Sequence, residues 1–414
     1  MNIKGNLKLL ILNSRHYLKG GSDRIYLEEM ELMERNGHHV IPFARRSDHD
    51  KATKYHHFFP PELDLSGGYS FKSFASALSI IYSHRTKKCL KNLLQQETPD
   101  IAHGHNIYAH LTTSVLDVLK AHEIPVVISL HDYKFICPNY FFLDGNRICE
   151  DCKRHRYYKA IQNRCVHGDF LYSCIYSIET YFNYLTKKYH NKIDKYVAVS
   201  RFIKNKFIEY GFPEDKIVYI PNFVDTDSFR VSDNDNGYFL FIGRLSKEKG
   251  LETLVSAFAK LKSKSHRLLI AGNGPLREQL EKIISIYNLA NVKLMGFLET
   301  KELNQAIQNC TCVIVPSECY ENCPLAVLES FANGKPVIGA RIGGIPELIE
   351  NGTDGLLFES GNADDLAEKM AHLASLPAAE ISQMGKAGRE KVERQYNAEK
   401  HYEALISLYN SLLH

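Results

Sequence analysis

The stretch ECYENCPLAVLESFANGKPVIGARIGGIPEL, residues 318–348, decides the fold of the second half of the chain. Proline suits the first turn of a helix and glycine suits its end, so Pro324 and Gly334 bound a predicted helix of about 2.5 turns. A buried strand over residues 336–339 follows, and Pro346 opens the next helix after a glycine turn. Strands and helices alternate in this way along both halves of the chain, which predicts two doubly wound sheets.

Two carboxylates flank the start of this predicted helix. Glu321 precedes it and Glu329 lies inside it, roughly two turns farther on at ~1.5 Å per residue. Between them, the backbone amides of Leu325 and Ala326 form a free helix N-terminus, which attracts an anion such as a diphosphate. A ligand with a central diphosphate and hydroxyls at both ends would match two flanking carboxylates. The competing interpretation is that both are ordinary charges on a helix surface.

The second half opens with a strand-to-helix turn that carries two cations. A predicted strand over residues 238–242 leads into Gly243, Arg244 and Lys249 before the next helix. Arginine offers a planar fork of donors and lysine a point charge, so together they can neutralise a diphosphate leaving group. Gly272 follows the next predicted strand of the same half. Two surface cations on a loop are the alternative.

The first half opens with a predicted strand over residues 7–12, a loop that ends in Gly20 and Gly21, and a helix that runs to Asn36. This is a βαβ start with a glycine turn after the first strand, and the helix N-terminus there could also meet a phosphate. A tight turn alone would equally explain the two glycines.

Three histidines follow predicted strands of the first half. His103 and His105 come at the end of one strand, and His131 follows the apolar strand over residues 125–130. Ligands of open parallel sheets sit beyond the carboxyl ends of the strands, so these side chains are expected to point toward a common crevice. For any one histidine, simple packing is the alternative.

Four cysteines follow His131 within a short segment: Cys137, Cys149, Cys152 and Cys165. The spacing of Cys149 and Cys152 is that of a chelating pair, and four thiolates fit a closed tetrahedral zinc site. Such a site would be structural, because four protein ligands leave no open position for chemistry. The alternative is that these are scattered buried cysteines, which pack as small hydrophobes, and Cys174 is a spare candidate ligand.

Length and charge point to two domains and a basic first half. A chain of 414 residues is too long for one typical domain. The net charge is +3, but residues 1–195 carry 27 Lys and Arg against 20 Asp and Glu. A basic surface suits an anionic acceptor or an anionic membrane, and the predicted basic helix over residues 71–96 could lie on such a membrane. A mild surface bias and a solvated helix face are the alternatives.

Several classes of protein are disfavoured by the sequence. No stretch approaches the ~18 apolar residues of a membrane span. The apolar run over residues 9–12 is too short for the core of a signal peptide, and ten cysteines in 414 residues do not suggest a secreted disulfide scaffold. The basic residues are not interleaved with an aromatic stacking platform, so no nucleic-acid partner is expected. We therefore expect a cytoplasmic enzyme.

These motifs resemble those of the family 4 glycosyltransferases, which are retaining sugar-nucleotide transferases with the GT-B fold. The resemblance lies in residues 318–348, in the frame Gly-Arg-Leu-x4-Gly over residues 243–250, and in Pro221 and Asn222. Phe223 stands where the family usually has a glycine, which puts a left-handed backbone at this point in doubt. The resemblance covers nearly the whole chain. It implies an α/β protein of two doubly wound, Rossmann-like domains that face each other across a cleft.

The resemblance also implies roles for single residues. Glu329 would hold the ribose hydroxyls, Glu321 would lie near the transferring sugar, and His131 matches the position of a histidine close to the reacting sugar. The residues expected to take part in catalysis are His131, Glu321, Arg244 and Lys249. Those expected to bind the nucleotide sugar are Gly20, Gly21, Asn222, Gly243, Arg244, Lys249, Gly272, Leu325, Ala326 and Glu329.

The expected domains follow the same pattern. Residues 1–221 would bind the acceptor and include a cysteine-rich segment, residues 137–174. Residues 222–237 would form a linker, residues 238–395 would bind the nucleotide sugar, and residues 396–414 would form a helix that crosses back to the first domain.

The implied reaction moves a sugar from a UDP- or GDP-sugar to an acceptor hydroxyl with retention of configuration, and needs no cofactor for catalysis. The expected acceptor is a glycan or a lipid-linked glycan of bacterial surface polysaccharide or glycolipid synthesis. We expect peripheral contact with the inner face of the plasma membrane. A sugar-nucleotide epimerase or a phosphorylase on the same fold, and a zinc-bearing binding module without catalysis, remain alternatives.

Overall fold

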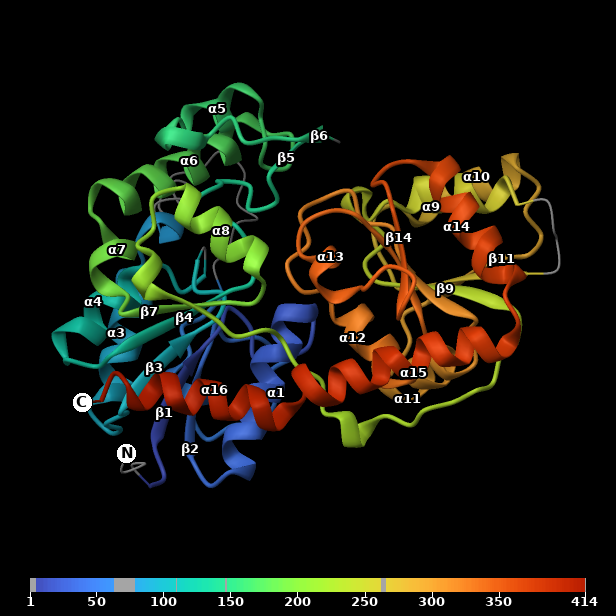
Figure 1. Ribbon diagram of the computed structural model, residues 1–414. Coiled ribbons are helices and arrows are strands. Elements are labelled where there is room, and N and C mark those ends of the chain that lie inside the picture. The colour runs from blue at the N-terminus through green and yellow to red at the C-terminus, as the bar shows by residue number, and fades with distance from the viewer. Residues whose placement is uncertain (1–4, 63–78, 109, 146, 262–265, 414) are drawn as a thin grey trace. The chain divides into compact units, whose positions relative to one another are not determined.

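The computed structural model describes residues 5–62, 79–108, 110–145, 147–261 and 266–413. The chain divides into two compact units (Figure 1). The first comprises Met1–Ile220 and Tyr402–His414, and the second comprises Pro221–His401. The segment expected to be a linker, residues 222–237, therefore belongs to the second unit.

The first unit is built on a six-stranded parallel sheet with the strand order β2-β1-β3-β4-β7-β8. Its strands are β1 (Lys8–Leu12), β2 (His39–Phe43), β3 (Ile101–Gly104), β4 (Val126–Leu130), β7 (Lys195–Ala198) and β8 (Ile217–Tyr219). Every residue of β3 and β4 is buried, as expected for central strands of a sheet that is covered on both faces. The chain moves outward from β1 to β2 and then returns to β3, so the topological switch point lies between β1 and β3.

Helices connect these strands, and the last helix of the chain completes their core. The connecting helices are α1 (Gly21–Arg35), α3 (His84–Leu94), α4 (Ser114–Ala121) and α8 (Arg201–Glu209). Helix α16 (Ala398–Asn410) contributes Leu405 and Tyr409, both fully buried, to the same hydrophobic cluster as Leu9, Tyr26 and Met33. The first unit is thus assembled from both ends of the chain.

A long insertion separates β4 from β7. It contains β5 (Leu143–Asp144), β6 (Arg147–Ile148), α5 (Tyr158–Gln162), α6 (Phe170–Leu185) and α7 (Lys188–Lys192).

Two helices of the first unit differ from what the sequence predicts. The tyrosine-rich stretch over residues 171–189 predicts a single helix, but Lys187 adopts a left-handed backbone with φ 51° and separates α6 from α7. In the helix expected over residues 71–96, α3 begins only at His84, where the Ser83 side chain accepts a hydrogen bond from the Thr86 amide. Residues 71–78 of that expected helix lie outside the described residues.

The second unit repeats the architecture with the strand order β11-β10-β9-β12-β13-β14, all parallel. The strands are β9 (Tyr238–Ile242), β10 (Arg267–Ala271), β11 (Val292–Gly296), β12 (Cys312–Val315), β13 (Val337–Ala340) and β14 (Gly355–Phe358). The sequence predicts strands over residues 238–242, 267–271 and 312–315, and β9, β10 and β12 have these bounds. The switch point of this sheet lies between β9 and β12.

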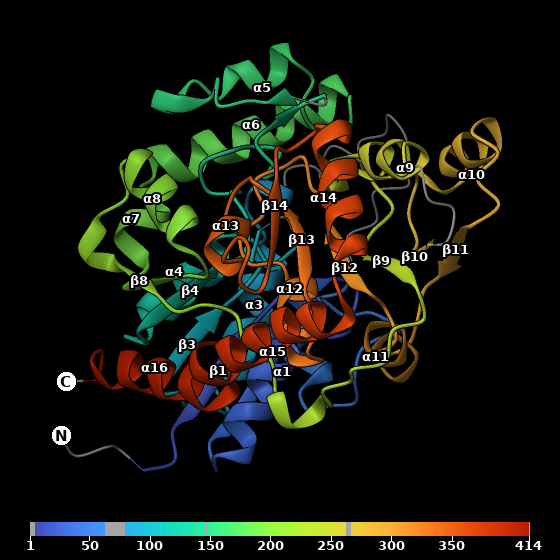
Figure 2. The same cartoon turned by 45° about the vertical axis from the view of Figure 1, so that its right-hand side comes forward.

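Helices pack in two groups in the second unit. Helices α9 (Leu251–Ala259), α10 (Arg277–Ile286) and α14 (Ala363–Ser375) form one group, and α12 (Leu325–Ala332) packs on α15 (Ala378–Gln395) (Figure 2). Helices α11 (Thr300–Gln308) and α13 (Ile345–Leu348) complete the unit. Among the described helices of the chain, none is both long and apolar enough to cross a lipid bilayer.

Candidate functional site

The charged residues predicted in the second unit lie at its switch point. The loop after β9 carries Arg244 and Lys249, and the loop after the neighbouring β12 carries Ser317 and Glu321. Parallel strands end at the same edge of a sheet, so the two loops emerge side by side. Lys249 Nζ lies 2.5 Å from Glu321 Oε1, and the Ser317 hydroxyl donates to the same oxygen at 2.7 Å. Two predicted site residues from motifs 72 positions apart thus form an ion pair.

Both members of this pair are charged at neutral pH. Burial acts to lower the pKa of the Lys249 ammonium, but the neighbouring Glu321 carboxylate outweighs it and raises that pKa. Burial acts in the opposite sense on Glu321, and the ammonium of Lys249 again outweighs it, so the pKa of Glu321 is lowered. Arg244, by contrast, is exposed, and no ion pair joins it to any described residue.

Glycines allow the loops at this edge to approach closely. A Cβ on Gly272 would lie 1.8 Å from the carbonyl oxygen of Gly243, at the ends of the adjacent strands β10 and β9. Gly250 has φ 65°, and a Cβ there would lie 1.8 Å from the carbonyl oxygen of Pro316. Any side chain at either position would push the loops apart. This explains why glycine stands at the end of the Gly-Arg-Leu-x4-Gly frame over residues 243–250.

Helix α12 begins next to Glu321. Its N-cap is Pro324, no side chain caps it, and its first residues Leu325 and Ala326 are half-buried. The uncapped amides form the anion-attracting terminus that the sequence predicts. Glu329 lies one turn farther on and is only 4% exposed.

Two contacts fix the segment that leads into α12. The Gly344 amide donates to the Glu321 carbonyl at 2.7 Å, and the Asn222 side-chain amide donates to the Cys323 carbonyl at 3.0 Å. Asn222 therefore lies beside the predicted donor site, where its side chain holds the backbone at Cys323 in position. Phe223 has no left-handed backbone and stacks on His401, with ring centroids 4.4 Å apart.

The switch point of the first unit carries hydrogen-bonding groups. Gly20 is the N-cap of α1 and Gly21 is its first residue, and no side chain caps this helix. Beside them, the Asn106 side chain donates to the Ser22 hydroxyl at 2.9 Å, and its backbone amide donates to Asn13 Oδ1 at 3.2 Å. Asn13 and Asn106 were not predicted as site residues, although Asn13 directly follows β1 and Asn106 is the second residue after β3.

Two of the predicted histidines are joined directly. His105 Nδ1 lies 2.8 Å from His131 Nε2, and the two rings are nearly coplanar, 10° apart, with centroids separated by 5.1 Å. This is the geometry of an in-plane N–H···N hydrogen bond. His131 is half-buried, whereas His103 and His105 are 0% and 2% exposed. The expectation that all three point into a common crevice is therefore wrong for His103, whose ring nitrogens meet Tyr409 and Ser129 in the core.

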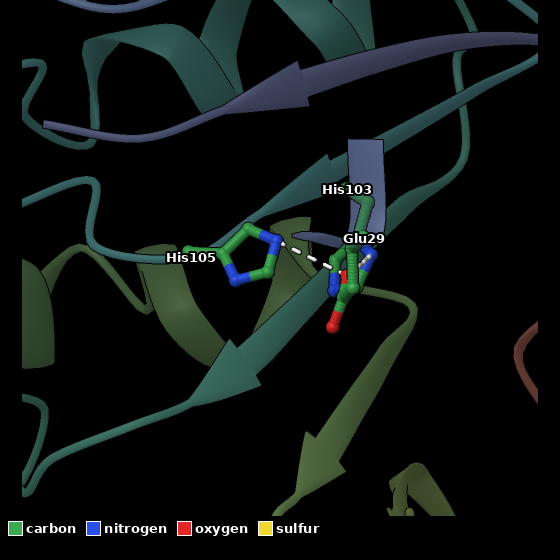
Figure 3. Close-up of side chains that lie close together, drawn as sticks. All are labelled: Glu29, His103 and His105. Atoms are coloured by element: carbon green, nitrogen blue, oxygen red, sulfur yellow. Dashed lines mark ion pairs between the residues drawn. The ribbon is translucent and has the colours of Figure 1, made fainter. Parts of the chain in front are cut away.

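Glu29, on the inner face of α1, lies close to His103 and His105 (Figure 3). Its Oε2 is 3.3 Å from His105 Nε2 and 3.6 Å from His103 Nδ1. If the carboxylate accepts the Nε2 proton of a neutral His105, then His105 Nδ1 must accept a proton donated by His131 Nε2. That leaves Nδ1 of His131 as a hydrogen-bond acceptor. Sequence reasoning missed Glu29 as well.

Glu29, His103 and His105 also form the only group of three potential metal ligands within 4.8 Å among the residues that the structure describes. The rings of His103 and His105 are stacked, with centroids 4.8 Å apart and planes 26° apart. A metal ion must lie near the plane of each ligating imidazole, and two nearly parallel planes do not meet at one ion. The arrangement favours hydrogen bonding over metal binding.

Asp132 follows His131 and is held by neighbouring donors. The Tyr108 hydroxyl donates to Asp132 Oδ2, and the Lys134 backbone amide donates to Oδ1 at 2.9 Å. Burial raises the pKa of Asp132 to about 6 in spite of these donors. A carboxyl group that titrates near neutral pH therefore adjoins His131.

The four cysteines predicted as zinc ligands share one part of the insertion. Cys152 and Cys165 pack in the same small hydrophobic cluster. Burial, followed by the nearby Cys137, Cys165 and Cys149, raises the pKa of the Cys152 thiol. Burial raises the pKa of Cys137 to about 11. The described sulfurs lie near one another without forming a group within 4.8 Å, so the zinc site stays a prediction.

Comparisons with known proteins agree with this architecture. The family described as Glycosyltransferase Family 4 matches residues 19–228, about half of the chain, and the family described as Glycosyl transferases group 1 matches residues 225–391. An uncharacterized glycosyltransferase of Methanocaldococcus jannaschii, MJ1178, is 26% identical over 80% of this chain and 81% of its own length. The amylovoran biosynthesis glycosyltransferase AmsK of Erwinia amylovora is 30% identical over 52% of this chain and 56% of its own.

Solved structures share the fold over the full length. A glycosyltransferase from Rickettsia africae superposes with a TM-score of 0.71 at 19% identity and covers 99% of both chains. The Anabaena protein HepE, solved in complex with UDP and glucose, gives a TM-score of 0.68 at 18% identity and covers 98% of this chain and 100% of its own. Both units, each a doubly wound parallel sheet, thus have counterparts in known enzymes. The chain belongs to the family 4 glycosyltransferases and has the GT-B fold.

Proposed function

We propose that this glycosyltransferase moves a sugar from a nucleoside diphosphate to an acceptor hydroxyl with retention of the anomeric configuration. The observation that carries the proposal is the charged edge of the second unit. There, Arg244, the pair of Lys249 and Glu321, and the uncapped N-terminus of α12 stand at the ends of β9 and β12. Cations and free amides at one sheet edge suit a diphosphate, and Glu329 in the next turn suits the ribose hydroxyls.

The chemistry follows from where charge develops. Breaking the anomeric C–O bond builds positive charge on the sugar and negative charge on the departing diphosphate. Arg244, Lys249 and the amides of α12 stabilise the negative charge, so catalysis needs no metal ion. Glu321 holds the Lys249 ammonium in place before the donor binds, which lowers the reorganisation that the transition state requires. The acceptor attacks from the face that the diphosphate leaves, and a phosphate oxygen takes the acceptor proton.

The first unit binds the acceptor in this proposal. His131 Nδ1 accepts a hydrogen bond from a hydroxyl near the reacting sugar. Glu29 acts as a positioning residue, because it sets the proton on His105, which in turn sets the proton on His131. Gly20 and Gly21 leave the N-terminus of α1 without a side-chain cap, which suits a phosphate group.

Relatives and structural neighbours suggest which ligands to test first. HepE is described with UDP and glucose, AmsK with amylovoran biosynthesis, and the putative glycosyltransferase WcaL of Escherichia coli with colanic acid biosynthesis. We propose a UDP- or GDP-sugar as the donor of this chain, and the UDP bound to HepE makes UDP-sugars the first to test. The acceptor is a glycan or lipid-linked glycan of a surface polysaccharide or glycolipid, used at the inner face of the plasma membrane.

Product analysis with a panel of nucleotide sugars tests this function. The expected result is slow hydrolysis of one UDP- or GDP-sugar, with release of the sugar in the anomeric configuration of the donor. Epimerised sugar without any acceptor would identify an epimerase, and turnover that requires inorganic phosphate would identify a phosphorylase. Absence of binding to every nucleotide sugar, measured by calorimetry, would contradict the proposal.

The same proposal includes a structural zinc ion in the insertion, held by Cys137, Cys149, Cys152 and Cys165. Bound zinc would keep the thiols deprotonated and cross-link the segment after His131. Mass spectrometry of protein purified without chelators should find about one zinc per chain. Cys152→Ser should lose it and Cys174→Ser should retain it. A wild-type protein that neither contains zinc nor takes it up would exclude the site.

A further inference from the structure

Helix α6 buries polar side chains and exposes apolar ones. Its buried residues are all polar: Ser173, Ser177, Glu179, Thr180 and Asn183. On its outer side the exposed fractions are 56%, 49%, 52% and 73% for Phe170, Leu171, Ile178 and Leu185. A surface helix of a globular protein normally shows the opposite pattern, with its apolar stripe turned toward the core.

The inward polar face is firmly anchored. Glu179 Oε2 lies 2.7 Å from Lys134 Nζ, and both side chains are almost completely buried. The Thr113 hydroxyl donates to Asn183 Oδ1 at 2.7 Å, and the Ser173 hydroxyl accepts a backbone amide at 3.0 Å. Turning the helix to bury its apolar side would leave the charge of Lys134 unpaired in the interior. The outward position of the apolar residues is therefore imposed by the rest of the unit.

The exposed apolar residues of the chain are concentrated on this helix and its neighbour. Eleven large hydrophobic residues are exposed in the described part of the chain, and six of them lie within residues 158–185. We call these six the α6 patch: Tyr158, Phe170, Leu171, Ile178, Tyr184 and Leu185. Helix α5, which carries Tyr158, packs beside α6 in both views (Figures 1 and 2). Apolar patches of this kind mark surfaces that meet a partner.

Basic residues flank the α6 patch at both ends of the helix. His155 stacks on Tyr184 with ring centroids 3.8 Å apart, which places the exposed Arg154 and Arg156 beside the C-terminal end of α6. Lys187, also exposed, follows the helix directly.

At the other end of α6, His167 meets Tyr172 with ring centroids 5.7 Å apart, and the exposed Arg164 lies three positions before His167. Residues 153–192 carry eight Lys and Arg against two Asp and Glu. Within the described residues, no ion pair neutralises Arg154, Arg156, Arg164 or Lys187.

We propose that the α6 patch docks this enzyme on an anionic lipid membrane. The helix lies in the plane of the interface, its apolar side chains enter the boundary of the acyl chains, and the flanking cations meet headgroup phosphates. Charge favours a membrane over a second copy of the chain, because symmetric pairing of this surface would bring its basic residues against one another. The inference rests on the proposed function in one respect, which is that a lipid-linked acceptor requires the enzyme at the membrane.

Vesicle flotation of the full-length protein tests the proposal. One set of vesicles contains phosphatidylcholine with phosphatidylglycerol, and the other contains phosphatidylcholine alone. Binding should be at least about fivefold stronger to the anionic vesicles and should weaken as salt is added. Ile178→Ser with Leu185→Ser should reduce binding to anionic vesicles about tenfold, and Arg154→Gln with Arg156→Gln should also weaken it.

A matched control comes from the second unit, where Ile286 and Phe297 are 75% and 66% exposed outside the α6 patch. Ile286→Ser with Phe297→Ser should leave vesicle binding within twofold of wild type, and circular dichroism should confirm that all variants are folded.

Wild-type protein that stays with the unbound fraction would overturn the proposal. The proposal would also be overturned if the wild-type protein were a dimer and the variant with Ile178→Ser and Leu185→Ser were a monomer. Hydrolysis of the sugar nucleotide in lipid-free solution should be unchanged in these variants. Vesicle binding therefore tests the docking surface, and hydrolysis separately tests the transferase function.

Discussion

The two parallel sheets of this enzyme have equivalent switch points with different chemistry. In the second unit the ends of β9 and β12 carry full charges, with Lys249 Nζ 2.5 Å from Glu321 Oε1. In the first unit the ends of β1, β3 and β4 carry amide, hydroxyl and imidazole groups, with His105 bonded to His131 at 2.8 Å. The topology fixes where a ligand can sit, and the side chains decide which ligand. A charged edge suits a diphosphate, and a hydrogen-bonding edge suits sugar hydroxyls.

Removing the two cations at the charged edge of the second unit should have the greatest effect on turnover. Arg244→Ala with Lys249→Ala should reduce turnover of the donor sugar nucleotide by about 10³-fold, because the leaving diphosphate loses both cationic partners. Steady-state kinetics gives this value. Lys247→Ala, which removes an exposed cation from the same turn, should change turnover less than about threefold. A near-normal rate in the double variant would remove the assigned role of the charged edge.

The second test separates the ribose end of the donor site from its phosphate end. Glu329→Gln should weaken nucleoside diphosphate binding about 10- to 100-fold, because the buried carboxylate proposed to accept the ribose hydroxyls becomes a neutral amide. Titration calorimetry with UDP and GDP measures the effect. Glu278→Gln, at an exposed position of α10, is the matched control and should bind as wild type does. Equal affinities for the Glu329 variant and wild type would count against the donor pose.

The third test applies to the first unit. Glu29→Gln should lower turnover about 10-fold while leaving nucleotide binding unchanged, because in the proposed relay Glu29 sets the tautomer of His131 through His105. Nitrogen-15 NMR of the histidine rings should show the proton of His131 moving away from Nε2. Glu28→Gln, whose side chain bonds Arg24 on the same helix, should leave both readouts as in wild type. An unchanged His131 tautomer in the Glu29 variant would rule out the relay.

The last test concerns stability rather than activity, through the pH dependence of folding at the same edge. The pKa of Asp132 is raised to about 6, above its unfolded value of about 4, so the folded state binds a proton that the unfolded state lacks in this range. The contribution of Asp132 to the free energy of unfolding is fully present below about pH 4 and is lost as the pH rises through about 6. Asp132→Asn should therefore gain about 2 kcal/mol relative to wild type between pH 4.5 and pH 7.5, as measured by urea unfolding. A constant difference between the two proteins would contradict it.

Much of the second unit could be predicted from its sequence because its signals are local. Strands β10 and β12 are apolar runs bounded by turn residues, and Pro324 and Gly334 mark the ends of α12 closely. The pairing of Lys249 with Glu321 is not local, since it depends on β9 and β12 being neighbours in the sheet. Sequence reasoning identified both residues but could not foresee that they meet.

The first unit was harder to predict because its decisive groups are buried in unexpected orientations. Glu29 lies three residues after Tyr26 and four before Met33, both core residues, and this phase could have shown that it faces inward. The sequence of helix α6 would predict that its apolar face is buried, but the buried face is the polar one. No periodicity can show which face is buried when an internal ion pair such as that of Lys134 and Glu179 anchors the polar side.

The closing helix has a consequence for how the protein is made. Leu405 and Tyr409 belong to the same core as Leu9, and Tyr409 holds the buried ring of His103 through a 2.6 Å hydrogen bond. On the ribosome, these residues emerge roughly four hundred codons after the first strand. The core of the N-terminal unit therefore stays incomplete until the C-terminal unit has been synthesised, and it is completed only when α16 has emerged and packed.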